Sequence, residues 1–167
     1  VILSINPSVT LVDISHEVTP FNIMEAGFIL SASFGYFPPG TIHVAVVDPG
    51  VGSSRKPLVL ITPLQMFIGP DNGIFSQVLK DNFPLTDALT TQHLSSLPKE
   101  VMAYHLNNPE FWIHPVSRTF HARDVFGPAA AHLSLGIDPD LMGEKVKTLE
   151  TLQLPDVDRS ESKIKGS

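Results

Sequence analysis

Apolar side chains follow two kinds of spacing in the first half of the chain. Residues 42–47 are apolar apart from His43, a pattern typical of a strand that is covered on both faces. We expect His43 to be a core residue whose ring has a hydrogen-bond partner. Residues 22–34 instead place apolar side chains at helical spacing behind Asn22, a possible N-cap, and residues 37–40, Phe-Pro-Pro-Gly, end this helix.

The remaining pattern adds strands and helices in alternation. Further strands are predicted at residues 10–14, 58–62 and 66–68, and further helices from residue 74 and over residues 123–135, the last ended by Gly136. Residues 85–116, with prolines at 98, 109 and 115, favour neither type. The alternation predicts an α/β fold, a layered sheet with helices on both faces.

The composition is that of a folded domain and argues against several classes of protein. The chain has 167 residues, of which 43% are hydrophobic and 17% charged, enough for one domain with a core. No apolar run approaches the ~20 residues that cross a bilayer, so no membrane partner is expected. The net charge of -6 argues against nucleic acid, and the absence of cysteine excludes disulfides and thiolate metal sites. The expected location is the cytoplasm.

Both ends of the sequence differ from its middle. The first residues, VILSINP, have the pattern of the last turns of a helix. From residue 144 to residue 167, 10 of 24 residues are charged, against 18 of the 143 before them. We therefore expect an α/β domain over residues 1–143, cut at its start, and a charged connection over residues 144–167 towards a further domain. A solvated C-terminal tail is the alternative.

The first candidate site is VVDPGVGSSR, residues 46–55. Its apolar strand ends in Asp-Pro-Gly at residues 48–50, which puts a carboxylate at a strand end, where open α/β sheets bind ligands. Arg55 follows seven residues after Asp48, and the glycines between them let backbone N–H groups approach a ligand. A tight turn in which Asp48 caps its own backbone explains the same residues equally well.

The second candidate site is TFHARD, residues 119–124, at the start of the last predicted helix. His121 lies where unpaired N–H groups and the helix dipole favour an anion or a polar ligand. In the alternative, Asp124 offsets that dipole and His121 only covers the helix start. The other six histidines lack metal-ligand spacing, so no metal site is predicted, and GPDNG at residues 69–73 has the composition of a turn.

Other sequence signatures of enzymes are absent from the chain. It has no phosphate-binding Walker loop, no dinucleotide-binding GxGxxG and no GxSxG nucleophile elbow. From the residues alone, the chain is an α/β domain whose candidate site combines an aspartate, an arginine and a histidine.

Taken together and in this order, VVDPGVGSSR, GPDNG and TFHARDVFGPAAAHLSLG resemble the S-adenosyl-L-methionine hydroxide adenosyltransferase family, once known as a domain of unknown function. This family is related to the fluorinase and chlorinase that make halogenated adenosines. The likeness extends over nearly the whole chain. It implies the family's N-terminal domain, without the first strand that ends in a TDFG-like motif and without the C-terminal β-barrel domain.

The resemblance also implies which residues form the site. The catalytic trio of the water-using members falls on Asp48, Arg55 and His121. In the halogenating relatives the aspartate position is typically tyrosine, so the resemblance favours water over halide. The residues implied in substrate binding are Phe21, Pro49, Gly50, Gly52, Ser53, Asp71 and Asn72.

The reaction implied by the resemblance is hydrolysis of S-adenosyl-L-methionine to adenosine and L-methionine, by in-line attack of an activated water at ribose C5′. S-adenosyl-L-methionine is the substrate, and no cofactor is expected. The family's sites lie between the subunits of a homotrimer, so the isolated chain is expected to be poorly active. The alternative is a non-catalytic domain that binds a nucleoside or S-adenosyl-L-methionine or only forms trimers, and an unrelated hydrolase with the same trio is a third hypothesis.

Overall fold

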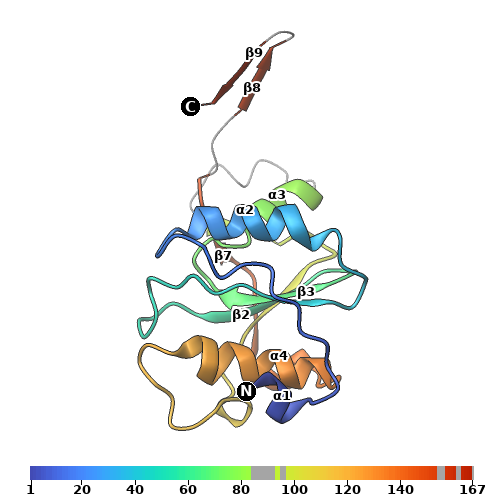
Figure 1. The fold of residues 1–167 in the computed structure, drawn as a ribbon, viewed down its shortest axis with the longest axis vertical. Helices are drawn as coiled ribbons and strands as arrows, with labels where there is room; N and C mark the ends of the chain where they lie inside the picture. Colours follow the sequence, from blue (N-terminus) through green and yellow to red (C-terminus); the bar gives the residue numbers. More distant parts are fainter. Residues whose placement is uncertain (84–92, 95–96, 154–156, 161–162, 167) are drawn as a thin grey trace.

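A mixed five-stranded sheet forms the centre of the computed structural model, which describes residues 1–83, 93–94, 97–153, 157–160 and 163–166 (Figure 1). Its strands, in the order β1-β3-β2-β5-β6, are β1 (Ile42–Val44), β3 (Met66–Pro70), β2 (Pro57–Ile61), β5 (Met102–His105) and β6 (Glu144–Val146). β1 runs parallel to β3, whereas the other neighbours in this sheet are antiparallel. β1 and β6 are therefore the edge strands.

Helices cover both faces of this sheet, which confirms the predicted layered α/β fold. On one face lie α2 (Ile23–Phe34) and α3 (Ser76–Asn82), and on the other lie α1 (Ile2–Ile5), a π-helical turn (Ala122–Phe126) and α4 (Gly127–Ser134) (Figure 1). The smaller elements are β4 (His93–Leu94), which pairs with β7 (Leu149–Glu150), a 3-10 helix (Pro109–Phe111), α5 (Pro139–Met142), and the hairpin of β8 (Val157–Ser160) and β9 (Lys163–Gly166).

The sheet separates two apolar cores, because successive side chains of a strand point to opposite faces. Leu58 and Leu60 of β2 pack towards α2 and α3, while Val59 between them packs towards α4. Ala129 and Ala130 line the sheet side of α4, and side chains this small let the helix approach the strands closely. The middle of the sheet is thus buried on both sides, and it supports the loops at its edge.

β1 is shorter than the predicted strand 42–47 and is covered less completely. Regular pairing ends at Val44, although the amide of Ala45 still donates to the carbonyl of Ile68 at 2.9 Å. The prediction of burial on both faces is wrong for Val44, which is 42% exposed because β1 lies at the edge of the sheet. The prediction for His43 is confirmed. It is buried with its Nε2 3.3 Å from Oε1 of Gln65, and burial lowers the pKa of its imidazole.

Other predicted elements have mixed outcomes. The helix over 22–34 is confirmed, with Asn22 accepting a hydrogen bond from the amide of Glu25 as its N-cap. The prediction of a strand over residues 10–14 is wrong. In the described part of the chain, no backbone hydrogen bond joins this segment to another strand. The last helix is confirmed apart from its first turn, which is π-helical. Residues 85–116, for which no prediction was made, fall partly outside the described residues.

Candidate active site

The loop after β1 is stabilised by hydrogen bonds among its own residues. The amide of Val51 donates to the carbonyl of Asp48 at 3.2 Å, and both the amide and the hydroxyl of Ser53 donate to the carbonyl of Gly50. The amide of Arg55 then donates to the Ser53 hydroxyl at 3.2 Å. The turn therefore uses the carbonyl oxygen of Asp48 and leaves its carboxylate for another partner. This answers the alternative in which Asp48 only caps its own backbone.

Asp48, Arg55 and His121 lie in direct contact. The guanidinium of Arg55 donates to both carboxylate oxygens of Asp48, from Nε to Oδ1 at 3.0 Å and from Nη2 to Oδ2. The same Nη2 lies 3.2 Å from Nδ1 of His121, which is 66 residues further along the chain. The side chains of Asp48 and Arg55 are each only 6% exposed. The aromatic ring of Phe126 lies under the guanidinium, 5.3 Å from ring centroid to Cζ.

This geometry determines which nitrogen of His121 carries the proton. An arginine can only donate, so Nδ1 of His121 is the acceptor and the neutral ring carries its hydrogen on Nε2. Arg55 keeps one further donor, because Nη1 is buried and has no hydrogen-bond partner among the described residues. A buried N–H of a charged group is costly to leave unpaired, so Nη1 marks a position suited to an oxygen acceptor.

The segment before His121 packs directly on the loop after β1. Gly52 has a φ of +76°, which favours glycine, and a Cβ there would lie 2.6 Å from the carbonyl oxygen of Arg118. The π-helical turn that follows His121 is a rare form of helix that is frequent at functional sites. Two segments far apart in sequence thus build one site.

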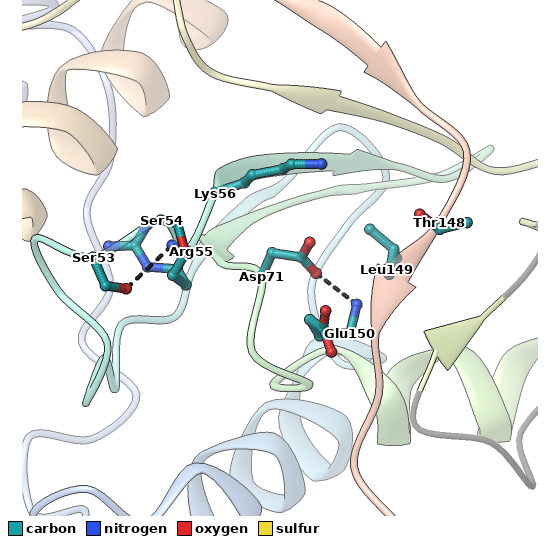
Figure 2. A pocket seen from close by; sticks show the side chains of 8 residues that line it. All are labelled: Ser53, Ser54, Arg55, Lys56, Asp71, Thr148, Leu149 and Glu150. Carbon is teal, nitrogen blue, oxygen red and sulfur yellow. Dashed lines mark hydrogen bonds between the residues drawn. The ribbon is translucent and has the colours of Figure 1, made fainter.

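A polar cavity of about 330 Å³ lies beside the trio, with Arg55 in its wall (Figure 2). Ser53, Ser54, Arg55 and Lys56 line one side, and Asp71, Thr148, Leu149 and Glu150 line the other. Oδ1 of Asp71 accepts a hydrogen bond from the amide of Glu150, drawn as a dashed line in Figure 2, and the two atoms are 2.8 Å apart. Burial raises the pKa of the Asp71 carboxyl above its ordinary value.

The structure distributes the predicted substrate-binding residues over different places. Ser53 and Asp71 line the cavity, and Pro49, Gly50 and Gly52 belong to the loop after β1. Asn72, just after β3, contacts the segment that precedes this loop: its side-chain Nδ2 donates to the carbonyl of Val47 at 2.9 Å. Phe21, just before α2, is 75% exposed and has a φ of +67°, which is rare for a bulky residue.

Several residues around the site were not predicted. Lys56, Thr148 and Glu150 line the cavity. Thr148 and Glu150 are brought there by the course of the chain after β6. No local sequence pattern indicates such a contact. Phe126, whose ring lies under Arg55, has the sequence spacing of an ordinary helical core residue, so the pattern does not indicate its contact with Arg55.

The residues that the structure describes also bear on metal binding and on membrane insertion. No group of three or more His, Asp or Glu side chains in this part of the chain could hold a metal ion. Over the same residues, no helix has the length and apolar character needed to cross a membrane.

Fold and site together define a layered α/β domain in which an aspartate, an arginine and a histidine meet beside the loop after β1. The chain belongs to the SAM hydroxide adenosyltransferase family, whose N-terminal domain matches residues 1–143. The chain spans about half the length of the curated relatives it matches.

Relatives and solved structures support this assignment. The chain is 35% identical over 150 residues to the (R)-S-adenosyl-L-methionine hydrolase of Thermus thermophilus, covering 89% of this chain and 54% of that protein. It is 22% identical over 167 residues to the fluorinase of Nocardia brasiliensis, covering 86% and 50% of the two chains. A crystal structure of an uncharacterized conserved protein from Thermotoga maritima superposes with a TM-score of 0.80 at 35% identity, covering 93% of this chain and 55% of that one.

Proposed function

We propose that the whole protein hydrolyses S-adenosyl-L-methionine to adenosine and L-methionine. The observation that carries the proposal is the contact among Asp48, Arg55 and His121, in which Nη2 of Arg55 connects the other two and the side chains of Asp48 and Arg55 are buried. It is supported by relatives of about a third identity that are named as (R)-S-adenosyl-L-methionine hydrolases.

The proposed reaction places its main difficulty on the nucleophile. The C5′–S bond breaks with its electron pair going to sulfur, so the leaving group is methionine, a neutral thioether that needs no proton. A C5′–O bond forms from water, and one proton is released. When the carboxylate of Asp48 takes that proton, the negative charge of the base and the positive charge of the sulfonium are both removed, and a site with little water favours such a step.

The trio has the donors and acceptors needed to hold and activate that water. Nη1 of Arg55 and the Nε2–H of His121 are the available donors to its oxygen. Each oxygen of Asp48 keeps a second lone pair beside its bond to Arg55, so the carboxylate can accept the proton of the water. A positioned general base contributes roughly 10²–10⁴-fold, and a correctly aligned water contributes further.

We also propose that the substrate extends from the trio into the polar cavity and meets the aromatic ring of Phe21. Ser53 and Asp71 are the predicted binding residues within the cavity. Phe21 is held at a positive φ while its ring stays exposed, and backbone strain of this kind is concentrated at ligand sites. The cytoplasmic location and the lack of a cofactor stay predictions of the sequence.

A homotrimer with sites between subunits is the proposed assembly. Met24 and Phe28 lie about one turn apart in α2 and are 44% and 66% exposed, and Phe21, just before the helix, is 75% exposed. An apolar stripe of this size is typical of a surface that another chain covers. Light scattering of the intact protein tests this, and a monomer at micromolar concentration would contradict it.

The test of the reaction is incubation of the intact protein with S-adenosyl-L-methionine in ¹⁸O-labelled water, followed by chromatography and mass spectrometry. We expect equal amounts of adenosine and methionine, with ¹⁸O in the 5′-hydroxyl of adenosine. Asp48→Asn should remove the activity and keep the fold. Nucleoside binding without methionine release would favour a non-catalytic domain, and 5′-halogenated adenosine in the presence of chloride or fluoride would favour a halogenase.

A further inference from the structure

Asp124 is a buried carboxylate that lies three residues after His121 and does not touch Asp48 or Arg55. Its side chain is fully buried, yet it forms three hydrogen bonds. We infer that Asp124 is a positioning residue, which orients His121 by holding the segment of residues 117–121. The orientation of His121 by Asp124 is independent of the proposed function, whereas its effect on kcat rests on that function.

The first contact of Asp124 is with the start of that segment. Oδ2 accepts a hydrogen bond from the amide of Ser117 at 2.8 Å. The hydroxyl of Ser117 in turn accepts from the amide of Thr119 at 3.2 Å. The chain is thus closed into a loop whose two ends, Ser117 and Asp124, are joined, and His121 lies within it. Because Arg118 of the same loop packs on Gly52, the loop is held between Asp124 and the segment that carries Asp48.

The second contact reaches the residue just before His121. Arg123 donates to Asp124 from Nε at 2.6 Å and from Nη2 at 3.0 Å. The same guanidinium lies over the ring of Phe120, 5.2 Å from its centroid. The carbonyl of Phe120 also accepts from the amides of both Arg123 and Asp124 at 3.0 Å. The carboxylate of Asp124 therefore holds the backbone before His121 at Ser117, and it fixes the guanidinium of Arg123 over the ring of Phe120.

The surroundings of Asp124 differ from those of a residue that only offsets a helix dipole. Asp124 is the acid in the first turn of the π-helix, but its carboxylate is fully buried and is paired with Arg123 and with the amide of Ser117. The hydrogen bonds from Arg123 and from the amide of Ser117 hold the pKa of Asp124 below its ordinary value. The carboxylate is thus kept charged, and only as an acceptor can it hold both partners.

The test that does not depend on activity is nitrogen-15 NMR of the histidine rings in the intact protein. In the wild type we expect His121 to show an unprotonated Nδ1 and a protonated Nε2, as its contact with Arg55 requires. Asp124→Ala should shift both nitrogens towards the averaged values of a free, tautomer-exchanging ring. His43, bonded to Gln65 on the other face of the sheet, is the internal reference for folding. Unchanged His121 signals in a folded variant would overturn the inference.

A milder variant and a matched control complete the experiment. Asp124→Asn keeps one oxygen in the place of Oδ2, which accepts from the amide of Ser117 and from Nη2 of Arg123, and loses the acceptor for Nε of Arg123. A smaller shift is therefore expected, and this variant replaces Asp124→Ala if that one does not fold. Asp138→Ala removes another carboxylate that accepts a backbone hydrogen bond, from Asp140, and should leave His121 unchanged. An equal shift in Asp138→Ala would show a general loss of stability and contradict the positioning role.

The kinetic consequence is measured in the intact protein. A displaced His121 should lower kcat by about 10- to 100-fold, because small misplacements of reacting groups have costs of this size, while KM changes little. A normal kcat together with a displaced His121 ring would contradict the role of Asp124 in the reaction. If the wild type releases no adenosine, the proposed function fails, and the NMR result still decides whether Asp124 orients His121.

Discussion

Gly52 lies against the carbonyl oxygen of Arg118, so close that a Cβ atom on residue 52 would be 2.6 Å from it. This contact joins the loop that carries Asp48 to the segment that carries His121. Gly52 also has a φ of +76°. The two parts of the site can meet only because no side chain is present at this position.

Gly52→Ala should therefore reduce both stability and activity. We expect a loss of about 1 kcal/mol or more in the free energy of unfolding from the positive φ alone, and a displaced segment 117–121 in addition. The matched control is Gly40→Ala, where φ is +85° but nothing lies within 4 Å of a new Cβ. Urea unfolding and adenosine release check this: the control should lose stability only. Equal activity in the two variants would contradict the role of the contact.

Replacing one partner of the Asp48–Arg55 pair should lower the free energy of unfolding more than replacing both partners does. Arg55→Leu leaves a buried carboxylate without its partner, which costs about 3–5 kcal/mol, whereas replacing both partners by apolar residues is often close to neutral. Urea unfolding of Arg55→Leu, Asp48→Leu and the double variant measures the difference. If the losses of the two single variants simply add in the double variant, the pair is not coupled.

Acidification should destabilise the domain through His43. Burial lowers the pKa of this imidazole below its ordinary value of 6.5 in the folded state. The unfolded chain then binds more protons, so the contribution of His43 is present above pH 6.5 and is lost as the pH falls from there towards the folded pKa. Unfolding by urea between pH 7.5 and pH 5 should show this slope, and His43→Gln should reduce it. An unchanged slope in His43→Gln would assign the effect to other groups, among them His105, whose pKa is also lowered by burial.

Asp71→Asn separates a structural role of this residue from substrate binding. Burial raises the pKa of Asp71, so the charged form is disfavoured in the folded state, and the cost is present once the pH exceeds the folded pKa. Asparagine keeps an acceptor for the amide of Glu150, so the variant should be as stable as the wild type or more so at pH 7. That gain should shrink as the pH falls towards 3.8. A raised KM would support substrate binding by Asp71, while an unchanged KM would restrict it to its contact with Glu150.

The sequence was informative where local pattern and function coincide. Asn22 has the residue type and position of an N-cap, and it is one. Asp48, Arg55 and His121 were predicted from two motifs, and the structure brings all three side chains together, although their catalytic role stays a proposal. The mixed direction of the strands was not predicted, because short apolar runs do not show which neighbour they pair with.

Long-range contacts explain the rest of the differences. Residues 10–14 have a β-type pattern, but a strand exists only if another strand pairs with it, and the pattern contains no information on that. The cavity joins Asp71 to Glu150, which are 79 residues apart, so no motif could indicate it. The π-helical turn has the same apolar spacing as an α-helix over so few residues, and spacing alone cannot distinguish the two.

The π-helical turn, Ala122–Phe126, sets how His121 is placed relative to α4 behind it. A π-helical turn contains one residue more than an α-helical turn. The helical register of His121 is therefore shifted by one residue relative to the face of α4 that packs on the sheet. Deleting Ala122 would restore α-helical register and rotate His121 by about 100° around the helix axis, while α4 kept its packing. The one extra residue of this turn thus decides whether the ring at position 121 faces Arg55.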